Sequence, residues 1–153
     1  MNDVSSIKIK LYQHCVDYVN TRIHHIQVAM QAAQESINGE TKSSAGDKHE
    51  TSRAMAQLEQ EKLSSQLKEA QKLQEILVGM NPNKSSSKAE LGSLVITNSG
   101  NYYICISAGK IEIDNEVYFA VSMVSPIGKA LLNAEELDSV EFNKQNILIK
   151  TLV

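Results

Sequence analysis

Aromatic residues are scarce in this sequence, which has no Trp, two Phe and five Tyr among its 153 residues. A pocket that stacks bases or encloses a drug-sized ligand needs several aromatic side chains, so the composition disfavours a conventional substrate cleft. Cysteine is rare as well, since Cys15 and Cys105 occur one in each half, without the close spacing of a metal or redox motif. We expect both to be reduced structural thiols.

The chain also lacks a long apolar run and an excess of positive charge. No apolar stretch in it approaches the roughly 18 residues of a membrane span. The start of the sequence, Met1-Asn2-Asp3-Val4, lacks the basic and apolar regions of a targeting signal. A net charge of −3 gives no field to hold nucleic-acid phosphates. We therefore expect a soluble, cytoplasmic protein with no membrane partner, whose action near RNA or DNA runs through another protein.

The first half of the sequence has the pattern of a long helix. From Ile7 to Ile37 apolar residues recur at alternating three- and four-residue steps, the period of a coiled-coil seam, and no Gly or Pro interrupts them. Asn38-Gly39 follows, and Gly after the last periodic residue is a common helix end. The predicted seam consists of Ile9, Tyr12, Val16, Val19, Ile23, Ile26, Met30, Ala33 and Ile37.

A second helical pattern runs from Asp47 to about Val78. Its periodicity is weaker, because Leu58 and Leu63 are separated by a five-residue step. Two helices of this length with a short polar loop between them fold back most simply as an antiparallel hairpin. The apolar positions predicted for this helix are Met55, Leu58, Leu63, Leu67, Ala70, Leu73 and Leu77.

Two carboxylates, Asp47 and Glu50, occur at the start of the second helix. Residues three apart on a helix are neighbours, with about 5 to 6 Å between their Cβ atoms, so both side chains can be directed at one ion. The same pair also resembles a capping box, in which Asp47 accepts from backbone N–H groups and Glu50 reaches back. The two interpretations do not exclude each other, because capping would fix the carboxylates in place.

The period changes beyond residues 81–90, a Pro- and Ser-containing linker. Runs of β-branched and aromatic residues separated by turn residues predict strands at 94–97, 102–106, 110–113, 116–121 and 147–150, which form a small antiparallel sheet. One helix interrupts them, with Ser125 as N-cap and Pro126 at its first position. The sequence therefore predicts an α+β protein: a helical coiled-coil hairpin over residues 1–80, with its acidic tip near 38–50, and a small β domain with one helix over 91–153.

This order of parts resembles the bacterial Gre transcript-cleavage factors. Ser125-Pro126-Ile127-Gly128-Lys129-Ala130-Leu131-Leu132 is similar to the Ser-Pro-Ile-Gly-Arg-Ala-Leu-Leu run of the Gre carboxy-terminal domain. Gly46-Asp47-Lys48-His49-Glu50 parallels the family's Gly-Asp-Leu-Ser-Glu, so Asp47 and Glu50 match its two metal-directing acids. The resemblance implies that residues 91–153 have an FKBP-like fold.

The resemblance also implies a function in trans. The β domain would dock on RNA polymerase through Ser125, Pro126, Ile127 and Gly128, and the hairpin would enter the secondary channel as a monomer. Asp47 and Glu50 would then share a Mg²⁺ ion with the polymerase and help it cut a backtracked RNA near its 3′ end. On this interpretation the protein is an accessory factor, is not itself an enzyme, and binds no cofactor tightly when free.

Two alternatives come from other features of the sequence. Where the family continues Asn-Ala-Glu-Tyr after the second acid, this chain has Thr51-Ser52-Arg53-Ala54. That departure suggests a Gre-homologous regulator that binds or inhibits polymerase at the channel without promoting cleavage. The FKBP-like resemblance also raises a prolyl isomerase, but the few aromatic residues offer little material for its pocket.

Overall fold

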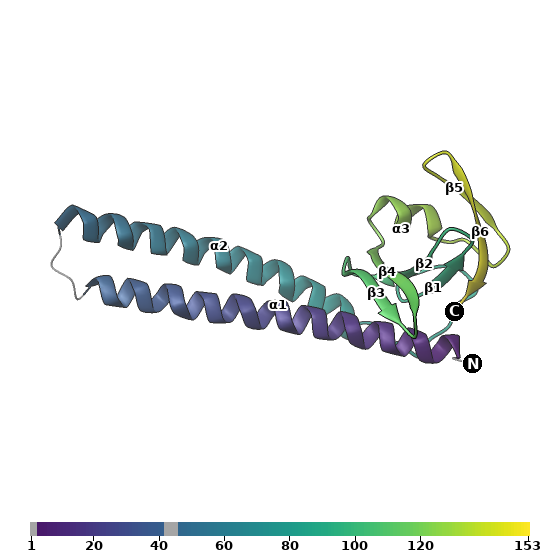
Figure 1. Cartoon of the computed structure of the whole chain (residues 1–153), viewed down its shortest axis with the longest axis horizontal. Helices are drawn as coiled ribbons and strands as arrows, with labels where there is room; N and C mark the ends of the chain where they lie inside the picture. The colour runs from purple at the N-terminus through teal and green to yellow at the C-terminus, as the bar shows by residue number, and fades with distance from the viewer. Residues whose placement is uncertain (1–2, 42–45) are drawn as a thin grey trace. The chain divides into compact units, whose positions relative to one another are not determined.

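The computed structural model describes residues 3–41 and 46–153 and has an α+β fold (Figure 1). Helix α1 spans Val4–Thr41 and helix α2 spans Gly46–Val78, so both predicted helices are confirmed. The predicted helix end at Asn38-Gly39 is wrong, because α1 continues through it to Thr41. Gly39 is exposed, and a single glycine in an exposed helix costs only about 1 kcal/mol, too little to end it.

The second half of the chain forms a six-stranded sheet and a short helix. All five predicted strands are present, with a sixth, β5, that the sequence pattern missed. Helix α3 spans Pro126–Leu131. The strands are β1 Leu94–Thr97, β2 Asn101–Cys105, β3 Gly109–Ile113, β4 Glu116–Ser122, β5 Ser139–Phe142 and β6 Gln145–Leu152.

The strand order in the sheet is β3-β4-β2-β1-β6-β5. One pair departs from the predicted antiparallel arrangement, since β2 and β4 run parallel. The reason is that the β3–β4 hairpin joins the sheet by its second strand, which places β4 beside β2 and leaves β3 at the edge. The hairpin turn is tight, with positive φ angles of 52° at Asp114 and 67° at Asn115, the conformation that Asn and Asp tolerate best.

By compactness the chain divides into two units. Residues 1–18 and 75–153 form the first, and residues 19–74 form the second, so both long helices contribute to each. The segment 81–90 belongs to the first unit and is bonded to it: the backbone of Ala89 donates to Ala134 and accepts from Asn133, each at 2.8 Å. Ala89 is fully buried, which a purely solvated linker would not be.

One face of the sheet packs against α3. Register pairs place Val95 opposite Leu152 and, around the bulge, Thr97 opposite Ile149, so alternate residues of β1 and β6 face the same side. The buried core on this side consists of Ala89, Val95, Ile104, Leu131, Ala134, Ile149 and Leu152. Since Leu131 comes from α3, burial of this cluster holds the helix on the sheet (Figure 1).

The opposite face of the sheet carries Leu94, Tyr103 and Ala120, which are register partners across three neighbouring strands. All three are buried, with Tyr103 and Leu94 at 0% exposure. The first turns of α1 lie on this side in Figure 1 and bury Ile7, Leu11 and Cys15, which recur every four residues. The predicted seam is wrong here at Ile9, which is 44% exposed.

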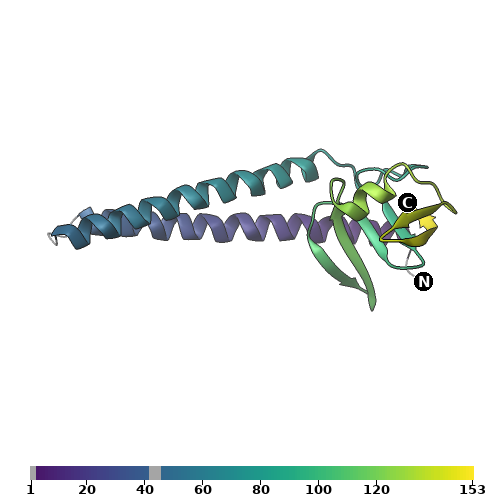
Figure 2. The same ribbon diagram turned by 90° about the horizontal axis from the view of Figure 1, so that it is seen from above.

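The second unit is a pair of helix segments that run side by side (Figure 1 and Figure 2). Ile26 of α1 packs with Leu63 and Ala70 of α2, and half-buried Ile23, Ala29, Met30, Ala33 and Leu67 surround them. The predicted seam is therefore confirmed in this region, where Ile26 and Leu63 are buried. Met55 and Leu58 of α2 are exposed instead, at 66% and 64%.

None of the helices described here is long and apolar enough to cross a membrane.

Candidate functional site

The acidic pair lies at the start of α2, which begins at Gly46. The backbones of Asp47 and Glu50 belong to its first turns, so the helical spacing that the sequence predicted is present. The side chain of Glu50 is exposed, whereas the side chain of Asp47 falls outside what the structure describes. Residues 42–45 of the predicted acidic tip are also outside the described ranges.

The number of donors at this helix start limits what it can hold. Mg²⁺ takes six oxygen ligands and keeps several waters, so two carboxylates bind it well only when further groups share the ion. Among the side chains that the structure describes, which leave out residues 40–49, no three His, Cys, Asp or Glu gather as a metal site. Because Glu50 is exposed, it is open to a metal ion whose remaining ligands come from another molecule.

The second predicted site is the start of α3, where Ser125 is the N-cap with an extended backbone (φ −69°, ψ 156°). Its hydroxyl accepts a hydrogen bond from the backbone N–H of Gly128 at 3.1 Å and donates one to the carbonyl of Ser122 at 2.6 Å. The hydroxyl thus satisfies one free N–H of the helix and ties the helix start to the end of β4. The predicted N-cap is confirmed.

The other three residues of this motif have distinct surroundings. Pro126 occupies the first turn, where a residue without an N–H loses no helical hydrogen bond. Its side chain is exposed. Ile127 is half-buried and packs against the buried core cluster that contains Leu131 of α3. Gly128 is buried, and a Cβ at this position would lie 2.0 Å from the carbonyl oxygen of Ser122. Only glycine allows this close approach of the two backbones.

Two apolar residues just before α3 were missed by the sequence analysis. Val124 is 76% exposed and Met123 is 37% exposed, and Pro126 is exposed two residues after Val124. Met123, Val124 and Pro126 are thus three exposed apolar residues close together in the sequence at the start of the helix, and we call them the α3 apron. The sequence carries a signal for their exposure: an apolar pair directly before a capped helix start lies in a turn rather than in the strand.

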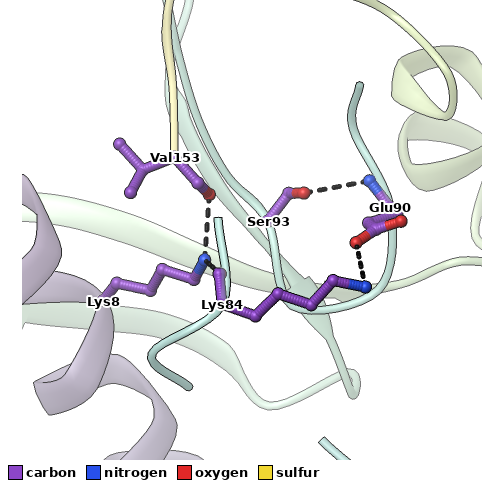
Figure 3. Close-up of polar contacts among 5 residues, drawn as sticks. All are labelled: Lys8, Lys84, Glu90, Ser93 and Val153. Carbon is purple, nitrogen blue, oxygen red and sulfur yellow. Dashed lines mark hydrogen bonds and ion pairs between the residues drawn. The ribbon is translucent and has the colours of Figure 1, made fainter. Parts of the chain in front are cut away.

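A cavity of about 400 Å³ in the first unit was not anticipated from the sequence. It is lined by Lys8, Met80, Lys84, Glu90, Ser93 and Met123 among others. Lys8 is only 3% exposed, and its ammonium donates to the carbonyls of Lys84 and Val153 (Figure 3). Burial lowers the pKa of Lys8, and the negative charge of Glu90 opposes that shift. Lys8 therefore joins α1 to the segment 81–90 and to Val153, the residue that follows the last strand.

Two further polar contacts join residues of the cavity wall to one another. Lys84 pairs with Glu90, with 3.2 Å between Nζ and Oε1, and the Glu90 amide donates to the hydroxyl of Ser93 at 2.9 Å (Figure 3). The cationic groups thus already have carbonyl or carboxylate partners. Lys8 can be buried because its ammonium is hydrogen-bonded to two backbone carbonyls.

The structure brings the predicted residues together as two separate sets. Ser125, Pro126, Ile127 and Gly128 share the start of α3 in the first unit, and Asp47 and Glu50 share the start of α2 in the second. The sequence matches no protein-family model and no curated protein. Function must therefore be argued from the residues themselves.

Proposed function

We propose that this protein is a Gre-like transcription elongation factor that binds RNA polymerase, inserts its helical hairpin into the secondary channel and stimulates cleavage of backtracked RNA. The observation that carries the proposal is the start of α2. Asp47 and Glu50 lie three residues apart in the first turns of the second helix of the hairpin, and Glu50 is exposed. The capped Ser-Pro-Ile-Gly start of α3 supports the same family resemblance.

The role of the two acids follows from the chemistry of phosphodiester hydrolysis. A second Mg²⁺, once shared with the polymerase, supplies positive charge to the reacting phosphate and orients the attacking water. Asp47 and Glu50 contribute oxygen ligands to that shared site, and α2 holds them at a fixed spacing. The polymerase cuts its own transcript, so the protein acts as an accessory factor.

The β domain supplies the attachment to polymerase. Its α3 apron is apolar and exposed, and protein interfaces place apolar anchors of this kind at their centre. Ser125 and Gly128 do not need to touch the partner, because both are used in holding the start of α3 against β4. Their role in binding is to position Val124 and Pro126.

The test is an RNA cleavage assay in stalled, backtracked elongation complexes. The isosteric pair Asp47→Asn and Glu50→Gln removes both charges, and we expect Mg²⁺-dependent shortening of the transcript to fall by roughly 10-fold or more. Glu59→Gln removes an exposed carboxylate farther along α2 and serves as the matched control. Transcripts that stay uncut with the wild-type protein would end the proposal of a cleavage factor.

Binding distinguishes the alternative function. The residues after Glu50, Thr51-Ser52-Arg53-Ala54, differ from the family pattern and favour a channel regulator that does not promote cleavage. Competition with a known channel-binding factor, in the absence of cleavage, supports that second function. No binding to purified polymerase contradicts both.

A further inference from the structure

Strand β3 forms one edge of the sheet, and only one side of its backbone is paired. It lies against β4 along its whole length, from Gly109 opposite Ala120 to Ile113 opposite Glu116. In the part of the chain that the structure describes, the strand order places no second strand beside it (Figure 1). The outer side of an edge strand presents N–H and C=O groups with which another strand can pair.

The hairpin turn decides which backbone groups of β3 point outward. The turn Asp114-Asn115 has two residues, so the pair of residues that flanks it exchanges hydrogen bonds. Such pairs alternate along an antiparallel ladder, which makes Ile111 bond to β4 and directs the backbone groups of Lys110 and Glu112 away from β4. Among the described residues, no backbone group outside the sheet bonds to either of these two.

The side chains at these two outward positions carry opposite charges. Lys110 and Glu112 are exposed and point to the same face of the sheet, whereas Ile111 between them points to the other face and is buried. Neither charged side chain has an ion-pair partner among the described residues. A lone lysine at a sheet edge discourages pairing, but a lysine and a glutamate two residues apart can match each other in a second copy.

Two-fold pairing of β3 with β3 of a second copy matches these charges in one register. When the two copies of Ile111 lie opposite each other in an antiparallel pair, Lys110 of each copy lies opposite Glu112 of the other. Both of these are hydrogen-bonded pairs, because they join the residues whose backbone groups point outward. A two-fold axis at Lys110 or at Glu112 would instead place like charges opposite each other, which destabilises a sheet.

The other edge of the sheet, strand β5, has no such complementarity. It pairs with β6 and spans Ser139–Phe142, in which Glu141 is the one charged residue. A second copy of β5 therefore brings no positive charge to meet Glu141. This difference favours β3 as the edge that a second copy recognises.

Strand β3 is also ordered before any partner arrives. Ile111 and its register partner Tyr118 are buried, at 1% and 3% exposure. Lys10 of α1 pairs with Asp114 of the hairpin turn, with 3.6 Å between Nζ and Oδ2. A strand that is already held in place loses little conformational freedom when another strand pairs with it.

We propose that β3 is a self-association surface, through which two copies of the chain pair antiparallel about Ile111 and join their sheets into one. The pairing uses neither the start of α2 nor the α3 apron, so it is independent of the proposed role in transcription. Because the paired segment is short and buries little surface, the dimer is weak and depends on protein concentration.

The experiment is sedimentation velocity of the full-length protein at low ionic strength over a series of concentrations, where we expect a monomer–dimer equilibrium. Lys110→Glu and Glu112→Lys each place like charges opposite each other at both pairs, and each should weaken dimerisation by roughly 10-fold or more. Net charge alone would move the two variants in opposite directions, since one gains negative and the other positive charge. The proposal is overturned if the wild-type protein stays monomeric at every concentration.

Charge exchange tests the register directly. The double variant Lys110→Glu/Glu112→Lys should dimerise as the wild type does, and an equimolar mixture of the two single variants should form heterodimers. Recovery in the mixture also shows that both single variants are folded. Failure of the double variant and the mixture to associate would contradict pairing about Ile111.

A matched control and a second measurement locate the interface. Glu141→Lys makes the same charge change on the opposite edge strand and should leave dimerisation unchanged. Dimerisation should also slow hydrogen exchange of the Lys110 and Glu112 amides, but have much less effect on the Ile111 amide, which already bonds to β4. Equal weakening by Glu141→Lys, or unchanged exchange at Lys110 and Glu112, would place the interface elsewhere and overturn the proposal.

Discussion

Gly128 lies against the backbone of Ser122 so closely that a Cβ atom on it would come within 2.0 Å of the Ser122 carbonyl oxygen. Backbone must move to relieve such a contact, because the neighbouring atom belongs to the main chain. We expect Gly128→Ala to lower the free energy of unfolding of the first unit by about 1 to 3 kcal/mol, the usual cost of overpacking. Thermal or urea denaturation of the purified protein measures it.

A matched control is Gly39→Ala in α1. Gly39 has no atom within 4 Å of the place that a Cβ would occupy, and it lies in an exposed helical turn. Alanine there should stabilise the helix by about 0.5 to 1 kcal/mol, since glycine has more backbone freedom to lose. Similar effects from both substitutions would contradict the close approach at Gly128.

Tyr103 and Tyr12 form a second matched pair. Tyr103 is fully buried, and among the described residues no group hydrogen-bonds to its hydroxyl, whereas the Tyr12 hydroxyl donates to the Leu77 carbonyl at 2.8 Å. At neutral pH, Tyr103→Phe should leave the free energy of unfolding unchanged or raise it by about 1 kcal/mol. Tyr12→Phe should lower it by about 1 kcal/mol. Urea denaturation of both variants tests the contrast.

The wild-type protein and the Tyr103→Phe variant should also differ in stability in alkaline solution. Burial raises the pKa of Tyr103 above its ordinary value of 10, and the nearby Cys105, Cys15 and Tyr12 add to the shift. The folded state therefore keeps a proton that the unfolded chain loses, so this contribution to stability is complete below pH 10 and declines as the pH rises further. Tyr103→Phe should lose stability less steeply above pH 10. If the stability of both proteins falls equally steeply above pH 10, the Tyr103 phenol ionises equally in the folded and unfolded states.

Leu63 and Leu58 of α2 differ in burial although the sequence pattern treats them alike. Leu63 is 6% exposed and packs with Ile26, whereas Leu58 is 64% exposed. Leu63→Ala should destabilise the second unit by about 2 to 3 kcal/mol, and Leu58→Ala by no more than about 0.5 kcal/mol. Amide hydrogen exchange within residues 19–74 reports this unit by itself. Faster exchange in the Leu58 variant would place the hairpin seam elsewhere.

The α3 apron gives a prediction that rests on the proposed function. Val124→Asp puts a charge on the most exposed residue of this surface and should weaken binding to RNA polymerase by roughly 10-fold or more, with little change in melting temperature. Leu137→Asp is the control, because Leu137 is equally exposed, at 77%, and lies outside the apron. Equal loss of affinity in both variants would indicate an effect of net charge alone.

Several elements could be predicted because their signals are local. The start of α3 is one, since the N-cap hydroxyl of Ser125 and the fixed φ of Pro126 act within one helical turn. The Asp114-Asn115 turn is another. Strand β5 was missed because it is short and lies at the sheet edge, where its residues alternate between exposed and half-buried without a fully buried position. Edge strands of this kind carry little hydrophobic pattern.

By itself the sequence determined that two long helices precede a small sheet, and that Asp47 and Glu50 lie three residues apart at a helix start. It could do so because helical period, caps and turns are properties of neighbouring residues. Only the tertiary structure decided which stripe of α1 is buried. Its first turns cover a sheet rather than another helix, so Leu11 and Cys15 are buried while Ile9 is exposed.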